Sequence, residues 1–220
     1  MIIVLTGQKR TGKSTAANFL KENGFKSLAL ADGFKPDLAF SIHRLGIRQF
    51  CYMDANGETN FDREEKIFNK KQVIEILQHA FLGILGDDQK YHYVDPLIEE
   101  YITQDQRELY SFREVMQICG TDIGCNEIDQ KIWVTKVLDK IIYDNNENFV
   151  ISDCRQDHEL DVFRKLGFKI IHIKRDTSGL VRNDNHITEK SLNIKEKDII
   201  INNDSSLDDF LQKISQIIKE

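Results

Sequence analysis

Proline, glycine, cysteine and long hydrophobic runs are all scarce in this chain of 220 residues. Its 2 prolines and 12 glycines leave little material for a flexible linker between domains. Its 4 cysteines form no C-x-x-C pair and no cluster with histidine at zinc-binding spacing, so we interpret them as reduced thiols of a cytoplasmic protein. No apolar run approaches the ~18 residues of a membrane span, and the N-terminus has no cleavage signal, so we expect neither a span nor a leader.

Positive charge is also in short supply. Lys and Arg number 30 against 36 for Asp and Glu, so the net charge is −6. An acidic chain is a poor general binder of nucleic acid or anionic membranes, although a local basic pocket can still hold an anion. At this length a chain can bury roughly 70–75% of its unfolded surface without a metal or a disulfide. We therefore expect a folded protein with neither nucleic acid nor a membrane as a partner.

Five short apolar runs are typical of strands that are buried on both faces. They are rich in β-branched residues and do not alternate with polar ones, and they occupy 2–5, 27–30, 149–151, 170–173 and 199–201. Helical patterns lie between them, including one that ends at Gly24 and one that begins at Trp133. Strands that alternate with helices predict an α/β fold of three layers, in which helices flank a parallel five-stranded sheet.

The middle of the chain, 44–144, is predicted to be mostly helical, with no convincing strand. Two capping-box patterns, Asn69-x-x-Gln72 and Ser111-x-x-Glu114, mark helix starts. We therefore predict a single domain, with a core from 1–43 and 145–220 and a helical insertion from 44–144 between the second and third strands. Residues 86–109 fit neither a helical nor a strand pattern, and we interpret them as a candidate mobile flap.

The strongest motif is GQKRTGKS at residues 7–14, which fits G-x-x-x-x-G-K-[ST] and lies between a predicted strand and a predicted helix. Its glycines let the backbone curl so that N–H groups point at a phosphate, and the helix adds its positive end. In such a loop Lys13 reaches the β- and γ-phosphates and Ser14 ligates Mg²⁺. A turn without a ligand would not explain the mutual repulsion of Lys9, Arg10 and Lys13. The motif therefore predicts a nucleotide-phosphate site.

A carboxylate, Asp153, closely follows the strand at 149–151, where P-loop proteins hold Mg²⁺ or its waters. Many strands end in Asp only because it starts a turn, so this assignment depends on the P-loop. A kinase with an anionic acceptor also needs cations for the acceptor phosphate. Basic residues in unusual local sequence are Lys35, Arg63, Arg113 and Arg155. Arg155 is favoured because it lies at the end of the strand, beside Asp153.

A basic group flanks the glycine-containing loop after the fourth predicted strand. It consists of Lys174, Arg175 and Arg182. These cations could close over the triphosphate as a lid that excludes water, although a solvated basic loop explains them nearly as well.

Two classes of protein fit a nucleotide-phosphate site, a phosphotransferase and a nucleotide-dependent switch. A GTP-binding switch needs N-K-x-D after a late strand, and the nearest match, at 69–72, lacks the Asp. D-x-x-G occurs at 54–57 and 176–179, but the first follows no strand and the second has no partner motif. We therefore favour a phosphotransferase and keep the switch as the weaker alternative.

Five further strings resemble the deoxynucleoside monophosphate kinases of T-even-type bacteriophages. They follow the family's order along the chain and are FDRE at 61–64, GTD at 120–122, IWV at 132–134, DCRQDHE at 153–159 and HITE at 186–189. The last two strings are far more specific than the P-loop. Ser14 departs from the family pattern, which carries an acidic residue there, and this departure bears on metal binding but not on the fold.

The resemblance implies transfer of the γ-phosphoryl group of ATP to a deoxynucleoside 5′-monophosphate (dNMP), such as dGMP, dTMP or a hydroxymethylated dCMP. It also implies a homodimer, and the cytoplasm of the host cell if the source is viral. The alternative is another small-molecule P-loop kinase, of the dephospho-coenzyme A kinase type. Because a monophosphate oxygen is already a nucleophile, we assign no general base.

Matching motif positions assign residues to three roles. ATP would be held by Lys9, Arg10, Gly12, Lys13, Ser14 and Thr15. The dNMP would be surrounded by Phe34, Lys35, Arg63, Gly120, Thr121, Trp133, Arg155 and Gln156. Lys13, Arg63 and Arg155 are the candidate catalytic residues, and Ser14 and Asp153 are the candidate Mg²⁺ ligands. Asp157 is a candidate orienter of Arg155. Trp133 lies on an apolar helical stripe, so the residues alone support a purely structural role for it equally well.

Overall fold

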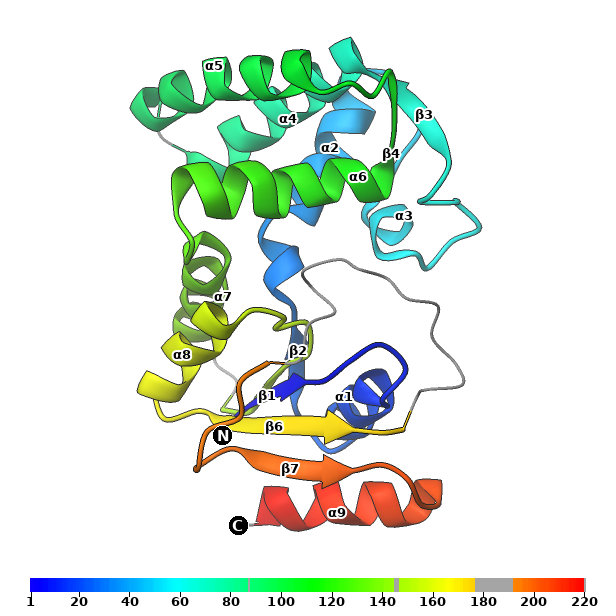
Figure 1. Ribbon diagram of the computed structural model, residues 1–220, viewed down its shortest axis with the longest axis vertical. Helices are drawn as coiled ribbons and strands as arrows, with labels where there is room; N and C mark the ends of the chain where they lie inside the picture. Colours follow the sequence, from blue (N-terminus) through cyan, green and yellow to red (C-terminus); the bar gives the residue numbers. More distant parts are fainter. Residues whose placement is uncertain (87, 145–146, 177–191, 220) are drawn as a thin grey trace. The chain divides into compact units, whose positions relative to one another are not determined.

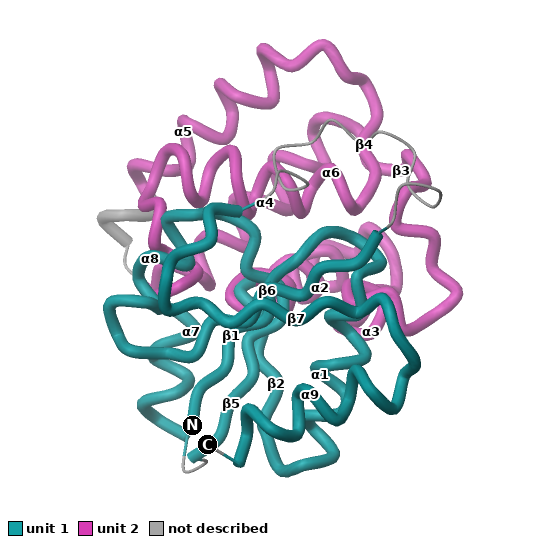
Figure 2. The backbone as a smooth tube through the Cα atoms, turned by 60° about the horizontal axis from the view of Figure 1, so that its bottom comes forward, with its two compact units in different colours: residues 1–30, 136–220 teal, residues 31–135 magenta. Residues whose placement is uncertain are grey.

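The structure is a computed structural model that describes residues 1–86, 88–144, 147–176 and 192–219. The chain divides into two compact units (Figure 2). Unit 1 contains 1–30 and 136–220, and unit 2 contains 31–135, which overlaps most of the predicted insertion. Within the described ranges, no helix is both long enough and apolar enough to cross a membrane.

Unit 1 is built on a parallel sheet of five strands in the order β2-β5-β1-β6-β7. Figure 1 labels β2, β1, β6 and β7 of this sheet. The strands are β1 (Ile2–Thr6), β2 (Lys26–Leu28), β5 (Phe149–Ile151), β6 (Lys169–Lys174) and β7 (Ile199–Asn202). Each contains one of the five predicted apolar runs or overlaps it, and each neighbouring pair is parallel. The predicted parallel sheet is therefore confirmed.

Helices cover both faces of this sheet. One hydrophobic core joins Ile3, Leu5 and neighbouring strand residues to α1 (Lys13–Glu22) and α9 (Leu207–Lys219). Val4 and Ile170 alternate with those residues, so they point to the opposite face, and they are buried as well. On β6, α8 (Asp157–Lys165) adds a further contact. Burial on both faces of the sheet explains why the sequences of the strands are continuous apolar runs.

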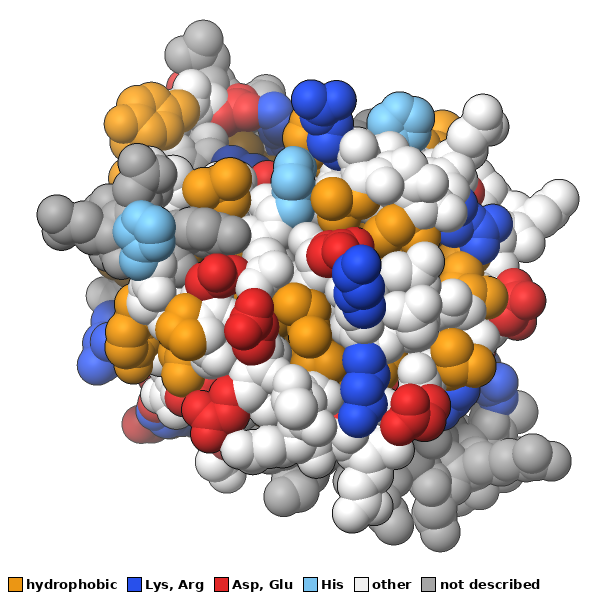
Figure 3. All heavy atoms as spheres, turned by 90° about the horizontal axis from the view of Figure 1, so that it is seen from above, with side chains coloured by type: hydrophobic (Ala, Val, Ile, Leu, Met, Phe, Trp, Pro, Cys, Tyr) orange, Lys and Arg blue, Asp and Glu red, His pale blue; other side chains and the backbone are white. Residues whose placement is uncertain are grey.

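Unit 2 is mainly helical. It contains most of η1 (Leu30–Gly33), α2 (Lys35–Arg44), α3 (Tyr52–Asn56), α4 (Lys70–Leu85), α5 (Asp88–Gln104), α6 (Phe112–Gln117), the π-helix η2 (Ile118–Ile128) and the first turn of α7 (Ile132–Tyr143). Both predicted capping boxes are present, with Gln72 and Glu114 accepting from the backbone N–H groups of Asn69 and Ser111. On the face shown in Figure 3, acidic, basic and hydrophobic side chains are interspersed.

Two predictions for the middle of the chain were wrong. Residues Lys66–Asn69 (β3) and Leu109–Ser111 (β4) pair as a small antiparallel sheet, where we expected no strand. Residues 86–109 are largely the helix α5, where we expected a flap, and α5 packs on α4 with Val94, Ile98 and Ile102 buried. Pro96 lies inside this helix. Because an interior proline ordinarily argues against a helix, the sequence pattern did not predict α5.

Candidate active site

The P-loop, residues 7–12, connects β1 to α1 in a conformation that two glycines make possible. Gly7 has φ +146° and Gly12 has φ +108°, both in the region that side chains disfavour. A Cβ at Gly7 would collide with the carbonyl oxygen of Ile173 on β6. A Cβ at Gly12 would lie 2.5 Å from the side-chain nitrogen of Asn203. The loop therefore lies against the ends of β6 and β7, and only glycine fits at these two contacts.

Lys13 is the first residue of α1, and its ammonium group reaches back across the loop. It donates hydrogen bonds to the carbonyl oxygens of Gly7 and Gln8, the latter at 2.6 Å. Ser14 and Thr15 follow in the exposed first turn, where backbone N–H groups have no partner inside the helix. The loop thus combines a lysine, hydroxyl groups and a helix N-terminus, which is the arrangement that binds phosphate.

Asn203 supports this loop and was not among the predicted site residues. It is 8% exposed, follows β7 directly and donates from its side chain to the carbonyl oxygen of Thr11 at 2.8 Å. The signal that could have identified it is its position, because ligands bind beyond the carboxyl ends of the strands in parallel sheets.

A hollow of about 500 Å³ lies beside the P-loop, entirely within unit 1. It brings together three of the predicted cations, Arg155, Lys174 and Arg175, with the loop residues Gly7 and Thr11. Two members of the predicted lid therefore line the same space as the P-loop. Arg182 and the HITE string at 186–189 lie outside the described residues.

Asp153 lies just after β5 and binds the backbone just after β2, the strand that pairs with β5. Its Oδ1 accepts a hydrogen bond of 2.6 Å from the N–H of Leu30. This contact gives the carboxylate a structural role of the kind that a turn-forming Asp has. Its role toward Mg²⁺ stays a prediction.

Glu159 binds the backbone of the turn that carries Arg155 and Gln156. One oxygen of this buried carboxylate accepts from the backbone N–H groups of Arg155 and Gln156, at 2.8 and 2.9 Å. Burial raises the pKa of Glu159, although these two hydrogen bonds oppose the effect. Asp157, predicted as an orienter of Arg155, accepts two hydrogen bonds from Asn193, at 2.9 and 2.8 Å.

A buried ionic network joins α8, β6 and the residue before β7. Asp198, whose side chain is 2% exposed, accepts from Arg164 Nε at 3.1 Å and from His172 Nε2 at 2.9 Å. Burial alone would raise the pKa of Asp198, but hydrogen bonds from Arg164, the Lys195 N–H and His172 outweigh it and lower the pKa to about 2. Burial also lowers the pKa of His172 and so favours the neutral ring, although the hydrogen bond to Asp198 opposes this effect. The network fixes the segment before β7 to α8 and β6.

Three predicted acceptor residues form one cluster in unit 2. Trp133 donates its ring N–H to the carbonyl oxygen of Gly120 at 2.6 Å, and its ring centroid lies 4.8 Å from that of Phe34. A Cβ at Gly120 would lie 3.0 Å from the Phe34 ring. Because Trp133 is only 4% exposed, it has a structural role here. Contact between this cluster, or the adjacent Thr121, and a nucleotide stays a prediction.

Two predicted cations of unit 2 converge on the end of α3. Lys35 donates to the Asn56 side chain at 3.1 Å, and Arg63 donates to the Ala55 carbonyl at 3.2 Å. The guanidinium of Arg63 also packs on Gly57, where a Cβ would lie 2.8 Å from its Cζ. Burial, and then the neighbouring charge of Arg113, lower the pKa of Arg63. The structure therefore places Lys35 and Arg63 together within unit 2, while Arg155 and Gln156 belong to unit 1.

Known proteins match this chain over nearly its whole length. The model of the deoxynucleotide monophosphate kinase family matches residues 1–214. The chain belongs to this family. The deoxynucleotide monophosphate kinase of Enterobacteria phage T4 is 32% identical and covers 99% of this chain and 98% of its own length. The enzyme of the same name from Escherichia phage RB69 is 33% identical, with 99% of each chain covered. Among solved structures, a dephospho-CoA kinase from Campylobacter jejuni is 18% identical over 100% of this chain and 96% of its own, with a TM-score of 0.37.

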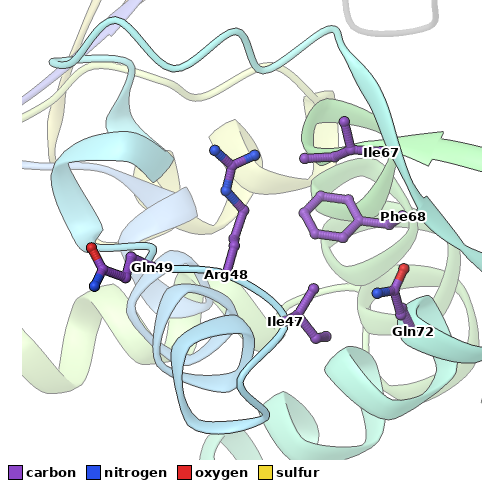
Figure 4. Close-up of a pocket in the computed structure, with 6 residues that line it drawn as sticks. All are labelled: Ile47, Arg48, Gln49, Ile67, Phe68 and Gln72. Atoms are coloured by element: carbon purple, nitrogen blue, oxygen red, sulfur yellow. The ribbon is translucent and has the colours of Figure 1, made fainter.

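A second hollow, of about 480 Å³, lies within unit 2 of this family member (Figure 4). It is lined by side chains from the loop after α2, from β3 and from α4, namely Ile47, Arg48, Gln49, Ile67, Phe68 and Gln72. The guanidinium carbon of Arg48 lies 4.6 Å from the ring centroid of Phe61. None of the lining residues belongs to the strings that carry the family resemblance, and we assign this hollow no role in catalysis.

Proposed function

We propose that this chain transfers the γ-phosphoryl group of ATP to a deoxynucleoside 5′-monophosphate and releases ADP and the deoxynucleoside diphosphate. Family membership over residues 1–214 supports this proposal. The observation that carries it is the hollow in which Arg155, Lys174 and Arg175 line the same space as the P-loop. Cations that line the same space as a phosphate-binding loop suit a reaction in which two anionic phosphates must approach each other.

The proposed reaction is a displacement at phosphorus. An oxygen of the acceptor phosphate forms a bond to the γ-phosphorus, while the bond from that phosphorus to the β,γ-bridging oxygen breaks and ADP leaves. Lys13 and the P-loop N–H groups would stabilise the charge on the transferred group, and Arg155 would neutralise the acceptor. Lys174 and Arg175 would hold the remaining phosphate charge and exclude water from the hollow.

The residues present fit a divalent cation bound together with ATP. Ser14 offers a hydroxyl group in the first turn of α1, and Asp153 offers a carboxylate at the end of β5. Mg²⁺ prefers such oxygen ligands and is usually bound through one or two of them plus substrate phosphates and water. When bound, it would neutralise charge on the β- and γ-phosphates.

We extend the proposal to the acceptor side and to assembly. Within unit 2, Lys35 and Arg63 are proposed contacts of the dNMP phosphate, and the cluster of Phe34, Gly120 and Trp133, with Thr121, is proposed to lie against the nucleoside. Within unit 1, Arg155 and Gln156 are proposed contacts of the dNMP phosphate. dGMP, dTMP and a hydroxymethylated dCMP are the proposed acceptors. The proposed assembly is a homodimer that works in the cytoplasm, of the host cell if the source is viral.

An acceptor panel tests the proposal. ADP release from ATP is measured with each common deoxynucleoside and ribonucleoside monophosphate and with dephospho-coenzyme A, in the presence and absence of Mg²⁺. We expect transfer to at least dGMP and dTMP, dependent on Mg²⁺, and none to dephospho-coenzyme A. Transfer to dephospho-coenzyme A alone would replace the proposed acceptor class with the alternative one. Sedimentation velocity at the assay concentration separates a dimer from a monomer.

A further inference from the structure

Residues 154–156 all donate to one carboxylate, that of Glu159. Glu159 is only 7% exposed, and its Oε2 accepts from the N–H groups of Arg155 and Gln156. The thiol of Cys154 lies 3.5 Å from the same oxygen and donates to it. Burial raises the pKa of this thiol well above its ordinary value, so it stays protonated as a donor. Three consecutive residues therefore direct donors at a single oxygen atom.

Helix capping alone does not account for this arrangement. At α4 and α6 the equivalent side chains, Gln72 and Glu114, each accept from the backbone N–H of the cap residue. Glu159 makes the same bond to Gln156 at the start of α8, but it adds the N–H of Arg155 and the thiol of Cys154. It does so as a buried carboxylate, which is costly unless the contacts it makes compensate for lost hydration. The additional contacts all lie in the turn that carries Arg155.

We infer that Glu159 is a positioning residue that fixes the Arg155–Gln156 turn, so that Arg155 is held beside the P-loop in the arrangement needed for the acceptor phosphate. The inference rests on the acceptor role proposed above for Arg155. Arg155 lines the hollow together with Gly7, Thr11 and Lys174, while Glu159 binds its backbone. An arginine whose backbone is fixed before the substrate binds loses less conformational freedom on binding.

Two substitutions of Glu159 separate the effect of its side-chain length from the effect of its charge. Glu159→Gln keeps the length of the side chain and an oxygen acceptor but removes the charge. Glu159→Asp keeps the charge near the N-terminus of α8, which suits the helix dipole, but withdraws the carboxylate by one methylene. If Glu159 positions the turn, the Gln variant keeps most activity, and the Asp variant loses about 10-fold to 100-fold in kcat/KM for the dNMP. The KM for ATP stays within about threefold in both, since the P-loop is untouched. A charge role alone predicts the reverse order.

Gln72→Ala is the matched control, because it removes the corresponding contact from the capping box of α4. We expect it to lower the melting temperature without changing the kinetics of either substrate. Glu159→Ala, which lacks the acceptor oxygen altogether, repeats the test if the Asp variant melts below the assay temperature. In these variants, a rise in the KM for ATP as large as the loss in kcat/KM for the dNMP would overturn the inference.

The decisive measurement is a double-mutant cycle with Arg155→Ala. Because Glu159 acts through Arg155, replacing Glu159 by Asp in the Arg155→Ala background should cost less than about threefold further in kcat/KM for the dNMP. Losses that multiply in the double variant would overturn the inference while leaving the role of Arg155 intact. An Arg155→Ala variant with normal dNMP kinetics would overturn the acceptor role of Arg155 and this inference with it. Absence of transfer to any dNMP by the unmodified chain would instead contradict the proposed function.

Discussion

The side chain of Asn203 donates a hydrogen bond to the carbonyl oxygen of Thr11, 2.8 Å away across 192 positions of sequence. The end of β7 thereby supports the P-loop. The same side-chain nitrogen occupies the space that a Cβ at Gly12 would need. Gly12 and Asn203 are thus a matched pair, in which the glycine of the motif is required partly by a residue at the other end of the chain.

Asn203→Ala should weaken the binding of ATP. The substitution leaves the buried carbonyl of Thr11 without this donor, at a cost of about 1–3 kcal/mol, and frees the loop at that point. We expect the KM for ATP to rise about tenfold, with the KM for the dNMP little changed. Steady-state kinetics with each substrate varied in turn measure both values. Asn202→Ala, at the exposed neighbouring position, is the control and should behave as the unmodified chain. An unchanged KM for ATP in Asn203→Ala would show that the contact does not support the loop.

Lys13→Ala should abolish phosphoryl transfer while the chain stays folded. Its ammonium group lies across the P-loop, beside the carbonyls of Gly7 and Gln8, where it can meet the migrating group. Electrostatic contacts of this kind are worth about 10²–10³ in rate or more. The turnover number and a thermal melt check the two halves of the prediction. Lys21→Ala, on the exposed last turn of the same helix, serves as the control. Transfer by Lys13→Ala within about tenfold of the unmodified rate would contradict the role that the P-loop motif predicts for this lysine.

Trp133→Phe should lower both stability and acceptor affinity. The variant loses the hydrogen bond to the Gly120 carbonyl, which lies in the same cluster as Phe34. A buried carbonyl left without its donor costs about 1–3 kcal/mol, and the cluster that is proposed to meet the nucleoside shifts with it. A thermal melt and the KM for dGMP and dTMP measure the two effects. Lower stability with an unchanged KM would leave Trp133 a purely structural residue. Because Trp133 is the only tryptophan, fluorescence titration of the unmodified chain with dGMP tests the same point without a substitution.

The fold was predictable where local pattern and tertiary environment agree. Strands buried on both faces have a distinctive composition, and the capping boxes at Asn69 and Ser111 mark helix starts by local hydrogen bonding alone. The strands β3 (KIFN) and β4 (LYS) were missed because each is short and mixes polar with apolar residues, so neither shows the continuous apolar run that marks the equally short β5. The helix α5 was missed because Pro96 contradicts its apolar spacing.

The candidate site was predictable only where its residues form a contiguous motif. GQKRTGKS encodes its own turn, so the sequence alone indicates a phosphate-binding loop. Glu159 lies in the DCRQDHE string and at the capping-box position of α8, but neither pattern predicts its hydrogen bond from the N–H of Arg155. Asn203 belongs to no motif, and its role depends on which backbone group the sheet brings to it. A residue that acts on the backbone of a distant segment leaves no local pattern, so physical reasoning from one sequence does not reach it.

Asp198 should make stability depend on pH in the acid range. Its pKa is lowered to about 2 in the folded chain, against about 3.9 in an unfolded one. The unfolded state therefore binds the proton more tightly, and a contribution of about 2–3 kcal/mol is complete above about pH 5 and is lost as the pH falls toward 2. Asp198→Asn removes this contribution and leaves Arg164 without its buried partner, so it should cost up to about 3–5 kcal/mol at neutral pH.

Urea unfolding of Asp198→Asn and of the unmodified chain, at several pH values from 7 to the acid limit of folding, tests this prediction. The free-energy difference between the two should be constant at neutral pH and should shrink below about pH 5. Asp161→Asn is the matched control, because Asp161 pairs with the same Arg164 at 2.9 Å but its side chain is 43% exposed. An exposed pair is worth about 0–1 kcal/mol, so this variant should differ little from the unmodified chain at any pH. A difference for Asp198→Asn that stays constant down to the acid limit would mean that the carboxylate has no lowered pKa, and that Arg164 and His172 hold the segment before β7 without its charge.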